Sequence, residues 1–110
     1  MPSFTTIKRN DTRPSFTATL IDSAGNAVNL IGATGLFLMR DPRTRKIKVS
    51  GAIIIIDATA GTIRYDWVAG DTDRAAVYQV EIQITFSDST VETFPNGSHH
   101  RLEILKDLGP

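Results

Sequence analysis

The stretch that decides the fold is Tyr78-Gln79-Val80-Glu81-Ile82-Gln83-Ile84-Thr85-Phe86, in which every second residue is apolar. Successive side chains of a β-strand point to opposite faces, so the apolar residues would share one face and the polar residues the other. Nine residues at a period of two therefore predict a strand with one buried and one solvated face. The same alternation returns in shorter runs, and the sequence predicts an all-β domain.

Turn-forming residues separate these runs, as in Ser23-Ala24-Gly25-Asn26 and Pro95-Asn96-Gly97-Ser98. Eight or nine short strands spaced about ten residues apart are typical of a sandwich or a small barrel. No long crossover fits between them, so we expect mainly antiparallel pairing. The expected strands are 3–8, 15–22, 34–40, 47–50, 53–56, 62–67, 78–86, 90–94 and 101–106, with a brief extended segment at 27–31.

The chain has 110 residues, which suits one domain, 1–110, around one core. Alternation assigns one face of each strand to that core. Gly35 stands where a larger apolar residue is expected beside Phe37. The predicted core is Phe16, Leu20, Leu30, Phe37, Met39, Ile63, Tyr65, Trp67, Tyr78, Val80, Ile82, Ile84, Leu102 and Ile104.

Composition excludes several classes of partner. Twelve basic and twelve acidic residues give a formal net charge of zero, which argues against a general nucleic-acid binder. The longest apolar run, Ala52 to Ile56, is far too short to span a membrane. The first ten residues lack the apolar region of a signal peptide, so we expect production in the cytoplasm. There is no cysteine, so the fold does not depend on disulfides.

The histidines and clustered carboxylates do not predict a metal site. His99 and His100 are adjacent, so on a strand they face opposite ways, and we expect a polar loop there. Asp66, Asp71 and Asp73 lack the closing glutamate of a calcium loop, and an Asp-capped turn is the favoured interpretation. We expect neither a metal nor another cofactor.

The remaining motifs also favour plain structural roles. The basic residues between Arg40 and Lys48 have no interleaved aromatic residues, which favours a solvated loop. Gly32-Ala33-Thr34-Gly35 lacks the lysine and the following helix of a phosphate loop. No nucleophile elbow or Cys/His pair is present. The chain is not expected to be an enzyme.

Three aromatic residues are assigned structural roles. Tyr65 and Trp67 share a face of the strand 62–67 and should point into the core. Tyr78 is placed like the tyrosine corner of immunoglobulin-like sandwiches, where the hydroxyl binds backbone a few residues upstream. A plain core tyrosine is an equally good interpretation.

An ordered set of segments along the chain resembles the immunoglobulin-like N-terminal domain of baseplate upper proteins from tailed phages. This domain family also includes small stand-alone phage and prophage proteins. The matching segments are Asp11-Thr12-Arg13-Pro14 with Phe16; Leu20-Ile21-Asp22 and Gly25; Val28-Asn29-Leu30 with Gly32-Ala33-Thr34; Phe37-Leu38-Met39-Arg40; Gly61-Thr62-Ile63-Arg64-Tyr65-Asp66-Trp67; Asp71-Thr72; Tyr78 with Glu81; and Thr93-Phe94-Pro95-Asn96.

The resemblance implies an immunoglobulin-like antiparallel β-sandwich in a virion structural protein of the tail, neck or baseplate. Such a protein would assemble in the host cytoplasm and act through contacts with other virion proteins or itself, as a homo-oligomer. The alternative is a carbohydrate-binding or host-adhesion module. Sugar sites usually display exposed aromatic residues, whereas the tryptophan and both tyrosines here fall on predicted core faces.

The candidate interface consists of apolar residues on faces that should be solvated, namely Leu36, Leu38, Ile53 and Ile55. A four-residue turn at 58–61 would place Ile56 opposite Ile63, and it would assign Ile54 and Ile56 to the core. A turn one residue shorter would exchange the two pairs. Exposed apolar rows usually mark interfaces, although a neighbouring strand or loop of the same chain is an alternative cover.

Overall fold

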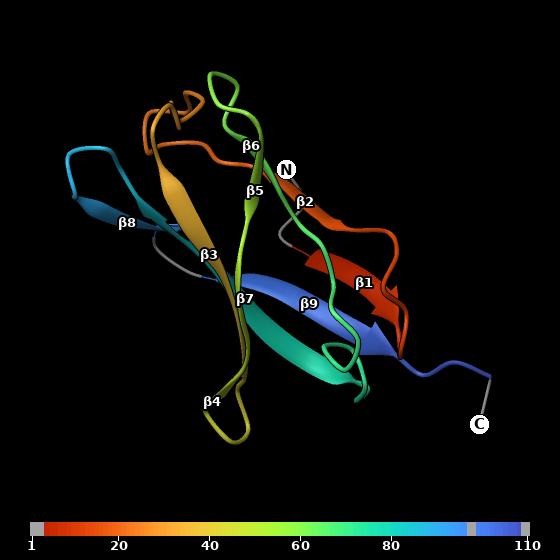
Figure 1. Cartoon of the computed structure of the whole chain (residues 1–110). Helices are drawn as coiled ribbons and strands as arrows, with labels where there is room; N and C mark the ends of the chain where they lie inside the picture. Colours follow the sequence, from red (N-terminus) through yellow and green to blue (C-terminus); the bar gives the residue numbers. More distant parts are fainter. Residues whose placement is uncertain (1–3, 97–98, 109–110) are drawn as a thin grey trace.

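The computed structural model describes residues 4–96 and 99–108, which form nine strands and no helix (Figure 1). Within these residues no helix is long and apolar enough to cross a membrane. The strands lie close to the predicted ranges. They are β1 (Phe4–Lys8), β2 (Phe16–Thr19), β3 (Thr34–Asp41), β4 (Lys46–Ala52), β5 (Ile54–Asp57), β6 (Thr62–Tyr65), β7 (Ala76–Thr85), β8 (Val91–Phe94) and β9 (His100–Leu105).

The strands form two sheets that pack as a β-sandwich, so the predicted fold class is confirmed. The larger sheet has the order β1-β9-β7-β3-β4, with β8 also paired to β7, and the smaller sheet has the order β2-β6-β5. Pairing is antiparallel except between β1 and β9, which run parallel. The segment 27–31 contributes only an isolated bridge, between Ile21 and Ala27.

Strand β7 organises the larger sheet. It pairs with β3 on one side, and on the other side first with β9 and then with β8. Its buried residues alternate strictly with less buried ones, as the sequence predicts. A slip of one residue would turn the whole apolar set to solvent, so this alternation fixes the register of the strand.

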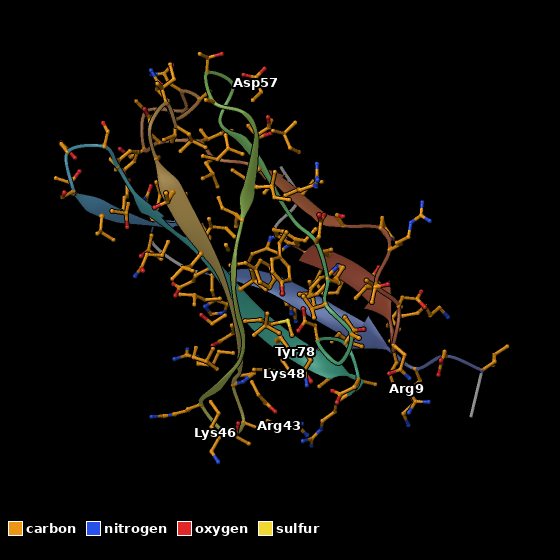
Figure 2. The ribbon with its side chains drawn as sticks, viewed as in Figure 1. Arg9, Arg43, Lys46, Lys48, Asp57 and Tyr78 are labelled. Atoms are coloured by element: carbon orange, nitrogen blue, oxygen red, sulfur yellow. The ribbon has the colours of Figure 1, made fainter. Side chains whose placement is uncertain are left out.

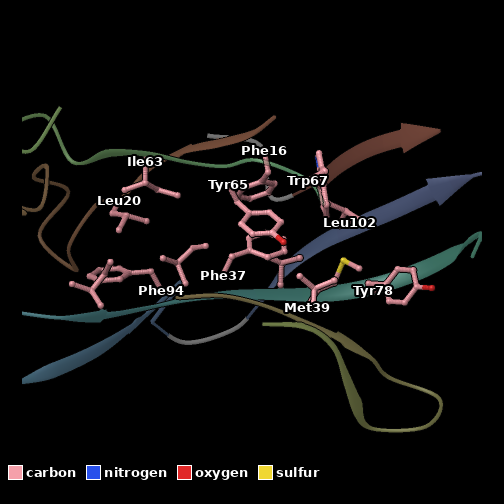
Figure 3. Close-up of a cluster of buried hydrophobic side chains, with 14 of the residues drawn as sticks. Phe16, Leu20, Phe37, Met39, Ile63, Tyr65, Trp67, Tyr78, Phe94 and Leu102 are labelled. Carbon is pink, nitrogen blue, oxygen red and sulfur yellow. The ribbon is translucent and has the colours of Figure 1, made fainter. Parts of the chain in front are cut away.

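The core lies between the two sheets (Figure 3), and all fourteen predicted core residues are buried. The ring of Phe37 on β3 stacks on Tyr65 of β6 at 4.4 Å between centroids, and Phe16 meets Phe37 edge-on at 5.1 Å. Gly51 leaves room for the Tyr65 ring, because a Cβ at position 51 would lie only 2.7 Å from Tyr65 Cε1. Aromatic pairs of this kind contribute about 0.5–1.5 kcal/mol beyond their buried area.

The predicted facing of the isoleucine segment 53–56 is wrong. Ile53 and Ile55 pack against the core, whereas Ile54 and Ile56 are 41% and 53% exposed. The four-residue turn at 58–61 does form, since Asp57 pairs with Thr62. A β-bulge at Ile56 then adds one residue to β5 and places Ile55, not Ile56, opposite Ile63.

The position of Ile53 explains why a glycine, and not a larger apolar residue, stands at position 35. Its N–H donates to the Gly35 carbonyl oxygen at 3.1 Å, and its side chain lies over that glycine. A Cβ on Gly35 would lie 2.7 Å from both Ile53 Cδ1 and Ile84 Cδ1. The space that a larger residue would take in β3 is therefore filled from the chain between β4 and β5.

Candidate interaction surface

The outer face of the larger sheet carries apolar residues from β3 and β4. Leu36 is 39% exposed and Leu38 is half-buried, so both point outward as the sequence predicts. Their pairing partners on β7 are the polar residues Gln83 and Glu81. Ile47 of β4, which the sequence argument did not select, is also exposed on this side. This outer face thus combines the apolar residues Leu36, Leu38 and Ile47 with polar residues of all three strands, among them Arg40 and Ser50.

The outer face of the smaller sheet carries a second apolar group. Ile54 stands opposite Arg64 of β6 and shares its outward face. Arg64 donates through Nε to Asp66 Oδ1 at 2.9 Å, and Ser15 donates to the same oxygen at 2.6 Å. The Ser15 hydroxyl and the Arg64 guanidinium keep the pKa of Asp66 below its usual value, so this surface places an ionised pair beside an exposed isoleucine.

The three aromatic residues assigned to structure are buried, as predicted. The Tyr78 hydroxyl donates to the backbone carbonyl of Arg74 at 3.0 Å, four residues upstream, which is the arrangement of a tyrosine corner. The Tyr65 hydroxyl donates to Asp71 Oδ2 at 2.6 Å. Burial first, and then the Asp71 carboxylate, raise the pKa of Tyr65. Trp67 packs edge-on against Phe37 and Tyr65.

The acidic residues near Trp67 are engaged separately. Asp71 Oδ2 accepts the Val68 N–H at 2.9 Å and so caps the turn, which confirms the Asp-capped interpretation. Asp73 instead forms an ion pair with Lys48 at 2.6 Å, and Asp66 accepts hydrogen bonds from Ser15 and Arg64. In residues 4–96 and 99–108, no group of three or more potential ligands is placed to hold a metal ion.

His100 is not part of a polar loop, so that prediction is wrong for this residue. It begins β9, is 5% exposed, and packs edge-on against Phe16. Its Nε2 is hydrogen-bonded to Thr5 Oγ1 at 2.6 Å, and burial lowers the pKa of the imidazole. The signal was present in the sequence, because alternation back from Leu102 and Ile104 places His100 on the inner face.

An apolar cavity of about 200 Å³ lies beside His100, between the edge strand β2 and the larger sheet. Ala18 and Leu20 line it from the β2 side, and Ile82 and Phe94 line it from the other. It falls below the range of about 300–1,000 Å³ that is usual for small-molecule sites.

Comparisons with known proteins support the fold only. No family model matches the chain, and no curated protein matches it. Among solved structures, the chain is similar to CopC from Methylosinus trichosporium OB3b, with a TM-score of 0.57 and 11% sequence identity. The alignment covers 96% of this chain and 87% of CopC. At this identity the likeness shows the β-sandwich and nothing further.

Proposed function

We propose that this chain is a structural protein of phage or prophage virions, a component of the tail, neck or baseplate. It is made and assembled in the host cytoplasm. It works through contacts with other virion proteins and with itself, and needs neither a cofactor nor catalytic chemistry. The ordered set of segments that resembles the phage domain family suggests this role.

The observation that carries the proposal is the apolar surface on the outer faces of both sheets. Leu36 and Ile47 contribute to it on the larger sheet, and Ile54 and Ile56 on the smaller one. Burying about 100 Å² of apolar surface favours association by roughly 2.5 kcal/mol before the entropic cost of association is subtracted. Residues of this kind surrounded by polar neighbours are typical of protein interfaces.

The buried aromatic residues favour this proposal over a carbohydrate-binding or adhesion module. Tyr65, Trp67 and Tyr78 all lie in the core. Phe4 is the exposed aromatic residue that comes nearest to a sugar platform, but the Arg101 guanidinium lies over its ring at 5.5 Å. A platform for sugar stacking would leave an aromatic face open.

The test is the composition of purified particles. Particles from a phage or induced lysogen that carries the gene are purified by density gradient and analysed by quantitative mass spectrometry. We expect the chain at a fixed copy number, and we expect deletion of its gene to stop assembly at a tail, neck or baseplate step. Complete, infectious particles that lack the chain would contradict the proposal.

A further inference from the structure

The molecule is elongated, and the β3–β4 hairpin and the turn at Asp57 lie on opposite sides of it. The principal extents are 46 × 25 × 23 Å. The β3–β4 hairpin projects at one end with Arg43 and Lys46, whereas Asp57 lies at the other end (Figure 2). The formal net charge is zero, but positive and negative residues are thus separated in space.

The projecting end is a basic tip formed by Arg43, Arg45 and Lys46. Within the described residues, neither Arg45 nor Lys46 takes part in an ion pair. The nearby Asp41 is buried, and its carboxylate accepts hydrogen bonds from the Arg43 backbone N–H at 2.9 Å and from the Arg43 guanidinium at 3.4 Å. Ile47 follows the tip and is 53% exposed, so cations stand beside an apolar side chain.

The opposite end is built from three connections that lie together. The Leu30 N–H donates to the Ala58 carbonyl at 2.8 Å, and Gly32 approaches Ser87 so closely that a Cβ would lie 3.1 Å from Ser87 Cβ. The segments 20–33, 57–61 and 86–92 contain no lysine or arginine. They form an acidic end consisting of Asp22, Asp57, Asp88 and Glu92.

The Asp57 and Asp88 carboxylates each keep one oxygen without a hydrogen-bond partner in the described chain. Asp57 and Asp88 each use Oδ1 to cap their own turns. The hydrogen bonds from Ala60 and Thr59 lower the pKa of Asp57, and those from Thr90 lower the pKa of Asp88. No ion pair of the described chain involves either residue.

The acidic end also displays apolar side chains. Ile31 is 62% exposed and follows Leu30, which binds the loop of Ala58. Ile56 is 53% exposed and directly precedes Asp57. Both ends therefore combine exposed isoleucine with charge, and the two charges are opposite in sign. An apolar centre with a charged rim is the usual arrangement of a protein interface.

We propose that the basic tip of one copy docks on the acidic end of a second copy. The contact would place Arg45 and Lys46 against Asp57 and Asp88, and Ile47 against Ile31 and Ile56. Because the two surfaces differ, the contact is heterologous, and repeating it gives a ring or a filament. The inference rests on the proposed function only in that a virion supplies many copies at high local concentration.

Sedimentation of the purified full chain tests the contact. In about 0.02 M salt the average mass should rise with protein concentration. In about 1 M salt it should return toward the monomer, because the Debye length falls to about 3 Å. A mass that stays monomeric at millimolar protein in low salt would overturn the docking. Association that strengthens in high salt would also overturn it, because it would be apolar in origin.

Charge variants locate the contact. Arg45→Glu with Lys46→Glu should weaken association about tenfold or more, since like charges then meet. Asp57→Asn with Asp88→Asn should also weaken it, and each amide oxygen still caps its turn. The matched control is Lys8→Glu with Arg13→Glu, which makes the same change in net charge on exposed residues outside the tip.

The control should associate as the wild type does, and equal association by wild type and tip variant would overturn the proposal. Preferential binding of the wild-type tip to single-stranded nucleic acid would overturn it too. A monomer in every condition would leave the virion role intact, because particle composition tests that role separately.

Discussion

Strand β7 alternates apolar with polar residues, whereas the isoleucine segment 53–56 is apolar throughout, and the two differ in what turns their side chains toward the core. In β7 every buried residue is followed by a less buried one, and strands pair along both edges. Segment 53–56 is apolar at all four positions and connects the two sheets. Its facing depends on a bulge at Ile56 and on the hollow over Gly35. Alternation specifies which face of a strand is buried. In an uninterrupted apolar run, the packing of neighbouring residues decides which side chains are buried.

Truncation in the core of β7 should have the largest effect. Ile84 is fully buried, so Ile84→Ala should cost about 2–5 kcal/mol of unfolding free energy. The matched change Ile56→Ala removes the same atoms from an exposed site and should stay within about 0.5 kcal/mol. Urea melts measure both losses of unfolding free energy. Equal losses would contradict the assignment of Ile84 to the core and Ile56 to the surface.

Within the isoleucine segment, alanine substitution should cost more unfolding free energy at an inward-facing position than at an outward-facing one. Ile53→Ala should cost about 1–2 kcal/mol, below the range for a fully buried isoleucine, because Ile53 is only half-buried over Gly35. Ile54→Ala is its matched control and should change the urea midpoint little. A larger loss for Ile54→Ala would restore the facing predicted from the sequence.

The tyrosine corner at the start of β7 should contribute less. Tyr78→Phe removes the hydrogen bond to the Arg74 carbonyl and leaves that oxygen without this partner. The expected cost is about 1 kcal/mol in urea melts with an unchanged slope. An unchanged midpoint would mean that the hydroxyl does not hold the corner.

The smallest expected effect comes from His100. Burial lowers its pKa in the folded chain, so the unfolded chain binds the proton at higher pH. Stability is therefore complete above the unfolded pKa of about 6.5 and declines as the pH falls below it. Melts between pH 5 and 8, compared with His100→Gln, isolate this contribution. Identical pH profiles for the two proteins would exclude it.

The sequence is sufficient for much of this fold because alternation is a local signal. It predicts the strands around Phe37 and Tyr78, the buried aromatic residues and the outward facing of Leu36. It does not predict the parallel pairing of β1 with β9, since that contact joins the two ends of the chain. It also misses the bulge at Ile56, because a bulge leaves no trace in the pattern of apolar residues.

The candidate surface was harder to predict for the same reason. Leu36 and Leu38 follow from alternation in β3, whereas Ile54 and Ile56 emerge only once the bulge is known. The basic tip was visible as a run of charges, but the acidic end was not. Its carboxylates come from three separate segments that meet only in the folded chain.

The central claim is that the bulge at Ile56 turns Ile54 and Ile56 to the outer surface and Ile53 and Ile55 to the core. The chain has no cysteine, so single cysteine variants at these four positions report accessibility directly. Each folded variant is labelled with a maleimide, and its rate is compared with that of the same variant in urea. We expect fast labelling at positions 54 and 56 and strong protection at 53 and 55. Fast labelling at 53 and 55 with protection at 54 and 56 would contradict the account.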